Sequence, residues 1–263
     1  MIVTLLTDFG VADYFVGAMK GALLSVNPQA TIVDITHEIP PHDIEAGAFT
    51  LLAAFDAFPP GTIHVAVVDP GVGSSRRAVV VESAGHAFVG PDNGVFGYVF
   101  EHLSRTRVFH VTNKKFFRAD VSATFHGRDI FAPVAGALSL GVRAEELGRE
   151  IGDFARLPFA APEVSEDGTL VGAIIHVDRF GNCVTNVSRR DLGADAITRG
   201  ARVAVGGHEI RSFRSFFGEE GEASGEPFAI WGSAGLLELA VFRDSAARVL
   251  DVVRGQKIEI RKA

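Results

Sequence analysis

The first half of the chain alternates short apolar runs with amphipathic segments. Runs rich in Val and Ile predict strands at 2–6, 32–35, 63–68, 78–82, 87–90 and 107–112. Apolar residues at helical spacing predict one helix capped by Asp13 and others near 45–58, 95–103 and 128–140. Strands that alternate with helices in this way are typical of an α/β domain, in which helices flank the sheet.

The pattern changes after about residue 155. Residues 155–168 contain two prolines and a polar Ser-Glu-Asp-Gly turn, which is the composition of a linker. Strands then dominate, with one short helix predicted at 244–250 and a loop at 214–226 that we expect to be mobile; the strands fall at 170–177, 184–187, 202–206, 227–231, 236–242 and 256–260. We therefore predict an α/β domain at 1–155 and a smaller, mostly antiparallel β domain at 165–263.

Composition narrows the class of protein. The chain has 263 residues, 47% of them hydrophobic, which is enough for one large domain or for two moderate domains with real cores. The net charge of −7 and the lack of a basic block argue against a nucleic-acid partner. No apolar run approaches the ~20 residues that span a bilayer, and the first residues resemble a strand rather than a signal peptide, so we expect a cytoplasmic protein with no membrane partner. The single cysteine, Cys183, excludes an internal disulfide.

The most distinctive polar stretch follows the strand at 63–68. Asp69 stands at the strand's end, a Pro-Gly-Val-Gly turn comes next, and Arg76 and Arg77 close the stretch. An acid at a strand end, before a glycine-bearing loop, is where α/β domains place chemistry, and Asp8 occupies the same position after the first strand. The simpler interpretation is a charged turn with a surface ion pair.

A third polar segment, 124–129, precedes the last helix of the first half. A histidine beside a carboxylate and an arginine is able to orient and activate water, which makes His126 a candidate. A helix cap with a solvated histidine explains the segment equally well. The chain has nine histidines but no His-Glu-x-x-His or comparable spacing, so we predict no metal site.

Two turns of the second half carry groups that suit a ligand. Residues 178–182 end in an amide that matches the edge of a purine, and residues 231–235 offer backbone N–H groups to a carboxylate. Both are also ordinary β-turn sequences. No Gly-x-Gly-x-x-Gly follows the first strand and there is no P-loop, which argues against a standard dinucleotide or nucleoside triphosphate site.

Taken in order, these segments resemble a known family. Thr7–Gly10, Asp69–Gly73 with the arginine pair, Pro91–Gly94, Thr124–Asp129, Asp178–Asn182 and Ser233–Ala247 are similar to the S-adenosyl-L-methionine hydroxide adenosyltransferases, relatives of the bacterial fluorinases and chlorinases. The resemblance covers essentially the whole chain and is weakest at 190–226. It implies that S-adenosylmethionine is hydrolysed to adenosine and methionine by attack of water or hydroxide on ribose C5′, without a cofactor.

The resemblance also implies a role for individual residues. The family's catalytic set falls on Asp69, Arg76 and His126, with Arg77 as the alternative arginine. Its substrate contacts fall on the ribose acid Asp8, the acids near the methionine ammonium (Asp13 and Asp178), the adenine-reading Asn182, and Phe180, Ser233 and the backbone near Arg243. Family members form trimers in which the first domain of one subunit and the second domain of the next hold the substrate.

Two other functions are open on the sequence alone. A halide-using enzyme of the same kind would form 5′-halo-5′-deoxyadenosine, although a carboxylate such as Asp69 repels a halide and so favours hydrolysis. A non-catalytic protein that senses S-adenosylmethionine or adenosine would bind without turnover.

Overall fold

The computed structural model describes residues 1–157, 161–193, 200–218 and 225–261, in two compact units, Met1–Phe159 and Ala160–Ala263. The first unit is an α/β structure and the second consists mostly of strands, which confirms the predicted fold class. Among the residues described, no helix is both long and apolar enough to cross a membrane.

The first unit is built on a seven-stranded mixed sheet with the order β2-β1-β3-β5-β4-β6-β7. Its parallel part consists of β2 (Thr31–Thr36), β1 (Ile2–Thr7), β3 (Ile63–Val67) and β5 (His86–Pro91). The antiparallel part consists of β4 (Ala78–Ser83), β6 (Arg107–Val111) and β7 (Gly148–Ile151). Because the chain passes to opposite sides of β1 to form β2 and β3, the carboxyl ends of β1 and β3 border the switch point at which such sheets bind ligands.

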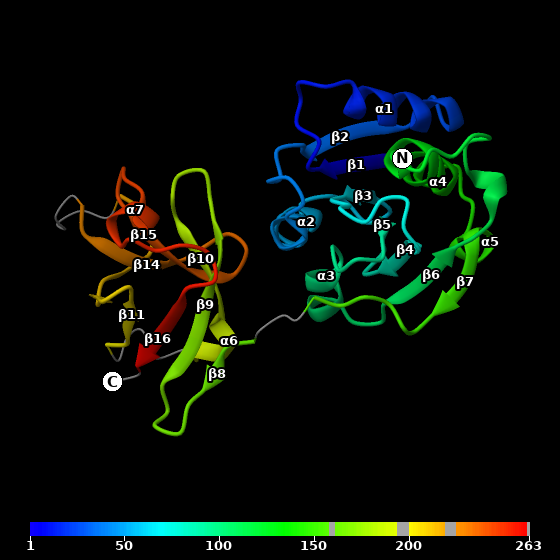
Figure 1. The fold of residues 1–263 in the computed structure, drawn as a ribbon. Helices are drawn as coiled ribbons and strands as arrows, with labels where there is room; N and C mark the ends of the chain where they lie inside the picture. Colours follow the sequence, from blue (N-terminus) through cyan, green and yellow to red (C-terminus); the bar gives the residue numbers. More distant parts are fainter. Residues whose placement is uncertain (158–160, 194–199, 219–224, 262–263) are drawn as a thin grey trace. The chain divides into compact units, whose positions relative to one another are not determined.

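Helices cover both faces of this sheet because successive strand residues point to opposite sides. Val3 and Leu5 of β1 pack in one core with α1 (Phe15–Val26) and α4 (Ala132–Ser139), and Figure 1 shows α1 beside β1 and β2. Leu6 packs in a second core with α2 (Ile44–Phe55) and with residues that precede and begin α3 (Gly97–His102). The sheet and the helices on its two faces form three layers, and the loops that follow β1 and β3 begin at the edge of the sheet.

Two helices of this unit differ from the sequence prediction. Helix α1 begins at Phe15 after Tyr14 and has no side-chain cap, so the predicted cap by Asp13 is wrong and Asp13 is an exposed acid. The helix predicted at 128–140 is a π-helical turn, Gly127–Phe131, that continues into α4. The pattern of apolar residues does not separate these hydrogen-bonding schemes, and π-turns often mark functional sites. Three short elements were not predicted: η1 (Lys114–Phe116), α5 (Ala144–Leu147) and β7.

The second unit is a nine-stranded sheet whose pairs are antiparallel except for β13 with β14. Its order is β12-β11-β16-β9-β10-β15-β14-β13, with β8 beside β9. The strands are β8 (Glu163–Val164), β9 (Leu170–Val177), β10 (Cys183–Ser188), β11 (Arg202–Val205), β12 (His208–Ile210), β13 (Phe213–Arg214), β14 (Pro227–Trp231), β15 (Leu236–Val241) and β16 (Lys257–Arg261), and the helices are α6 (Arg189–Leu192) and α7 (Ala246–Val249).

Sequence patterns anticipated six of these strands and α7, and missed the shortest elements. The expected mobile loop at 214–226 lies partly outside the described residues. Burial raises the pKa of the Cys183 thiol to about 11, so this cysteine acts as a small apolar core residue.

Two buried histidines, His64 and His86, lie on the adjacent strands β3 and β5 of the first unit. The imidazole of His64 shares a hydrogen bond with Thr4 Oγ1 through Nδ1 (2.8 Å) and one with His86 through Nε2 (3.2 Å). The ring stacks on Phe88, with 5.1 Å between centroids. Burial, and then the charge of His86, lowers the pKa of His64 to about 3. The folded protein therefore holds this imidazole neutral at pH values well above 3.

We expect the free energy of unfolding to fall as the solution is acidified below pH 6.5. The unfolded chain takes up a proton at His64 near its ordinary pKa of 6.5, whereas the folded chain does so only near 3. At about 1.4 kcal/mol per pH unit, His64 accounts for about 2 kcal/mol between pH 7.5 and 5. Urea unfolding of the wild type and His64→Gln at both pH values measures this contribution. Equal pH dependence in the two proteins would contradict it.

Candidate active site

Asp69 follows the carboxyl end of β3, directly after the buried Val68. The loop then folds back, because the N–H of Val72 donates to the Asp69 carbonyl (3.2 Å) and the N–H of Arg76 donates to Ser74 Oγ (3.2 Å). Arg76 thereby returns to Asp69, whose carboxylate accepts hydrogen bonds from Nε (3.0 Å) and Nη2. The two side chains are only 4% and 10% exposed, so they form a buried, bidentate ion pair.

A second loop brings His126 to this ion pair. Gly73 has φ +80°, and a Cβ on it would lie 2.2 Å from the carbonyl oxygen of Ala123, so only glycine allows the two loops to meet here. Across this contact, Arg76 Nη2 donates to His126 Nδ1 at 2.7 Å. The structure therefore joins the three predicted catalytic residues, Asp69, Arg76 and His126, in one chain of hydrogen bonds.

The buried carboxylate of Asp129 holds the loop that carries His126. It accepts two hydrogen bonds from Arg128 (2.7 and 2.9 Å) and one from the N–H of Ser122 (2.9 Å). Asp129 is fully buried, and the π-helical turn at 127–131 begins directly after His126. These bonds tie the two ends of the loop together, and they fix the imidazole relative to Arg76.

The contact with Arg76 determines the protonation of His126. A guanidinium only donates, so Nδ1 must be the acceptor, and the neutral ring carries its hydrogen on Nε2. Burial and then the charge of Arg76 lower the pKa of His126, although Asp69 and Asp129 oppose this effect. At neutral pH, His126 is therefore an uncharged imidazole that donates through Nε2.

A small cavity of ≈150 Å³ lies beside this chain of hydrogen bonds. Phe9, Phe15 and Phe125 line it, with their rings in mutual contact at 5.2–5.9 Å between centroids. Asp69 and His126 are the charged or titratable groups of its wall. The cavity has room for a few small groups, and its apolar walls keep bulk water away from the carboxylate.

The other predicted residues of the first unit take separate positions. Arg77 binds Asp92 (2.7 Å) and Asp153 (2.8 Å), so Arg76 alone of the arginine pair reaches His126. Asp8 follows β1, the strand that pairs with β3, and its carboxylate accepts from the N–H of His42 (2.8 Å). Asp8 and Asp69 thus stand at the ends of adjacent parallel strands.

The second unit has a pocket of ≈750 Å³ that gathers the candidates of that half. Of the predicted residues, Asp178, Phe180, Asn182, Ser233 and Arg243 line it. Arg243 has φ 57°, a left-handed backbone that is uncommon for a non-glycine residue and that is often found at binding sites.

Asp178 and Asn182 are parts of one turn in this pocket. The Asp178 carboxylate accepts from the N–H groups of Phe180 (2.9 Å) and Asn182 (2.8 Å) and from the Asn182 amide (2.9 Å). Asn182 is 7% exposed, so its amide is held in one orientation. A contact of Asp178 with a ligand ammonium stays a prediction, whereas its role in orienting Asn182 is visible.

Sequence reasoning missed Glu238, which also lines this pocket. It stands in the apolar strand β15, between Leu237 and Leu239, and an acid inside such a run is the signal that was available. Burial, and then the nearby charge of Asp178, raises the pKa of Glu238.

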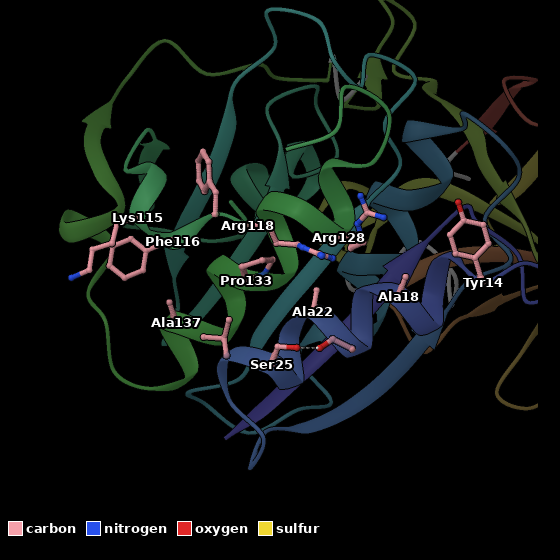
Figure 2. A pocket seen from close by; sticks show the side chains of 13 residues that line it. Tyr14, Ala18, Ala22, Ser25, Lys115, Phe116, Arg118, Arg128, Pro133 and Ala137 are labelled. Atoms are coloured by element: carbon pink, nitrogen blue, oxygen red, sulfur yellow. Dashed lines mark hydrogen bonds between the residues drawn. The ribbon is translucent and has the colours of Figure 1, made fainter. Parts of the chain in front are cut away.

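Another cavity of the first unit, ≈690 Å³ in volume, lies between α1 and α4 (Figure 2). Lys115 and Phe116 stand at one end of it and Tyr14 at the other, with Ala22 and Ser25 between them. It contains none of the predicted site residues, and its Arg128 is bound to Asp129. Within the described part of the chain, no group of three or more His, Cys, Asp or Glu side chains is arranged to hold a metal ion.

Fold and site together define a two-domain protein whose α/β unit carries a buried acid–guanidinium–imidazole chain at the edge of its sheet. Residues 3–148 match the SAM hydroxide adenosyltransferase N-terminal domain, and residues 172–259 match the C-terminal domain of that name. The chain therefore belongs to the SAM hydroxide adenosyltransferase family.

Individual proteins show the same relationship. The (R)-S-adenosyl-L-methionine hydrolase of Thermus thermophilus is 39% identical, over 97% of each chain. A crystal structure of an uncharacterized conserved protein from Thermotoga maritima has a TM-score of 0.89 and 36% identity, over 99% of each chain. A fluorinase of Nocardia brasiliensis is less similar, with 27% identity over 99% of this chain and 96% of its own length.

We expect Arg76→Gln to raise the pKa of His126. The guanidinium lowers this pKa in the wild type, and its removal leaves the Asp69 carboxylate to favour the imidazolium. A pH titration of His126 followed by ¹⁵N NMR measures the change, and it also reports whether Nδ1 is the unprotonated nitrogen.

Arg77→Gln is the matched control, because it removes the same charge from the next residue, which binds Asp92 and Asp153 instead. It should leave the His126 titration unchanged. If Arg76→Gln also left it unchanged, the hydrogen bond between Arg76 and His126 would be absent in solution.

Proposed function

We propose that this protein hydrolyses S-adenosyl-L-methionine to adenosine and L-methionine. The observation that carries the proposal is the hydrogen-bonded chain of Asp69, Arg76 and His126 beside a small apolar cavity. A full-length relative, at 39% identity, carries the name of this activity.

The chemistry requires a well-placed nucleophile rather than a strong acid. The sulfonium of the substrate is already a good leaving group, so the C5′–S bond needs no protonation to break. A water oxygen attacks C5′ from the side opposite sulfur, the electron pair of the C5′–S bond passes to the methionine sulfur, and the water proton is released. Alignment and partial dehydration of that water are the contributions that a protein site supplies.

The hydrogen-bond pattern supports a division of roles among the three residues. With Nδ1 occupied by Arg76, His126 offers an Nε2–H donor, which orients the water oxygen but does not take its proton. Asp69 is then the group that accepts the proton, and a placed base of this kind contributes about 10²–10⁴-fold. Arg76 stays protonated and holds both partners in position.

The remaining candidates fit the other parts of the substrate. We propose that Asp8 binds the ribose hydroxyls, and that Asn182, Phe180 and the backbone near Arg243 bind adenine. Ser233 would contact the methionine carboxylate, and the acids Asp13 and Asp178 would lie near its ammonium group. No step of this reaction requires a resident cofactor.

A halide-using reaction is the alternative, and the position of Asp69 disfavours it. A halide pocket needs hydrogen-bond donors and little negative charge, whereas the Asp69 carboxylate forms part of the cavity wall. A water molecule is compatible with this carboxylate, because the water donates a hydrogen bond to the carboxylate oxygen.

We expect the purified protein, incubated with S-adenosylmethionine in chloride-free buffer made with ¹⁸O-water, to form methionine and adenosine that carries ¹⁸O at O5′. Mass spectrometry identifies both products. A halogenated nucleoside that forms only when chloride or fluoride is added would establish the halide reaction instead. Bound adenosine without turnover would indicate a binding protein.

Asp69→Asn and Arg77→Gln form a matched pair of variants for this assay. The first keeps the size of the side chain but removes the proposed base, and it should lower kcat at least about 10²-fold. The second changes a charged residue that contacts Asp92 and Asp153, so it should keep most of the activity.

We further propose that the protein is a cytoplasmic homotrimer, in which the first unit of one subunit and the second unit of the next share a substrate. Exposed aromatic side chains at the pocket of the second unit support a partner there, with Phe180 78% and Phe217 44% exposed. Light scattering at the concentration of the assay should give three times the 28.0 kDa of one chain. A stable monomer that still turns over would rule out a shared site.

A further inference from the structure

The cavity between α1 and α4 has no role in the functions described so far. It shares no lining residue with the cavity beside His126 or with the pocket of the second unit. We propose that this cavity is a second ligand site, which binds a small organic phosphate monoester. The proposal is independent of the reaction at Asp69, because none of its residues takes part in that reaction.

The charge of the cavity wall is opposite to that of the whole protein. The described residues that line it include Lys115, Arg118 and Arg128 and no acid, whereas the chain carries a net charge of −7. Behind this wall, the fully buried Asp129 pairs with Arg128, and its carboxylate lies 3.8 Å from Arg118 Nε. One carboxylate does not neutralise three cations, so the wall keeps a positive charge that attracts an anion.

A phosphate monoester matches both the charge and the donors of this wall. It carries a charge of about −1.5 to −2 near neutral pH and three strong acceptor oxygens. Guanidinium and ammonium groups are the side chains that bind such oxygens. The side chain of Arg118 is 51% exposed and Lys115 is exposed, so both are accessible to a ligand. The substrate proposed above has a positively charged sulfonium, which the same wall repels.

Short side chains leave room for the organic part of the ligand. They come from two helices: Ala18, Gly21, Ala22 and Ser25 of α1, and Pro133 and Ala137 of α4 (Figure 2). A Cβ on Gly21 would have no heavy atom within 4 Å, so the space beside it is open. Tyr14 and Phe116 stand at opposite ends of the cavity and offer aromatic surface. The volume of ≈690 Å³ is in the range of small-molecule sites.

The charged wall of the cavity also belongs to the support of the His126 loop. Arg128 lies two residues after His126 and donates to both oxygens of Asp129 (2.7 and 2.9 Å). The N–H of Arg118 donates to the Asp129 carbonyl (3.0 Å), and the Asp129 carboxylate accepts from the N–H of Ser122 (2.9 Å). A phosphate at the two arginines therefore borders the hydrogen bonds that fix this loop.

Benzyl phosphate tests the site, with benzyl alcohol as the comparison that lacks only the phosphate. We expect calorimetry in low-salt buffer at pH 7.5 to give a Kd for benzyl phosphate below about 1 mM, and a Kd at least about tenfold higher for the alcohol. The ¹⁵Nε resonances of Arg118 and Arg128 should shift on binding, because both side chains line the cavity.

Two glycine variants of α1 locate the ligand. Gly21→Leu fills the open space and should raise the Kd of benzyl phosphate at least about tenfold. Gly17→Leu is the matched control, because Gly17 is also exposed and free of neighbours within 4 Å but does not line the cavity, so the Kd should stay unchanged. Leucine is a better helix former than glycine, so neither change should unfold α1.

A pair of lysine variants tests the charge. Lys115→Gln removes one cation of the wall and should raise the Kd about three- to tenfold, since an interaction with a charged group is lost. Lys114→Gln removes the same charge from the exposed residue beside it, which does not line the cavity, and should leave the Kd unchanged. Equal Kd values for the two glycine variants, equal binding of benzyl alcohol, or no binding of benzyl phosphate at 10-fold the expected Kd, about 10 mM, would overturn the proposal.

Discussion

The site of the first unit depends on one buried guanidinium. Arg76 donates to the carboxylate of Asp69 and to the imidazole of His126, and so it joins two loops that lie 50 residues apart in the chain. Burial of the ion pair is favourable only while both partners are present, and removal of one typically costs about 3–5 kcal/mol. The same guanidinium sets the tautomer of His126, so Arg76 determines both the position of the imidazole and which of its nitrogens carries the hydrogen.

In each unit, one aspartate accepts hydrogen bonds that fix a turn or loop, and that turn or loop carries a candidate site residue. In the first unit, Asp129 ties the loop whose end presents His126. In the second, Asp178 folds the turn that orients Asn182, while Glu238 has no such partner among the described residues. In both units, a carboxylate that accepts several local hydrogen bonds therefore fixes the turn beside a candidate ligand-binding group.

Several contacts that shape these sites depend on glycine at a particular position. Gly73 lets the loop that carries Arg76 approach the carbonyl of Ala123, and Gly232 leaves space for the carboxylate of Glu238. Neither glycine is chemically reactive, yet a methyl group at either one would separate groups that must meet. The positions of the charged residues in the sequence are therefore not enough to form these sites, because the backbone must also come close at the two glycines.

The sequence alone determined the alternation of strands and helices in the first half, the change to strands in the second, and the strand-end positions of Asp8 and Asp69. These are local properties, because side-chain periodicity and turn residues act over a few neighbours. Tertiary structure decided that Arg76 rather than Arg77 reaches His126, that Asp13 caps no helix, and that Glu238 faces a pocket. The choice of arginine depends on partners far apart in the chain, His126 for Arg76 and Asp153 for Arg77, and the pocket of Glu238 is lined by residues from Asp178 to Ser245; a local pattern specifies neither.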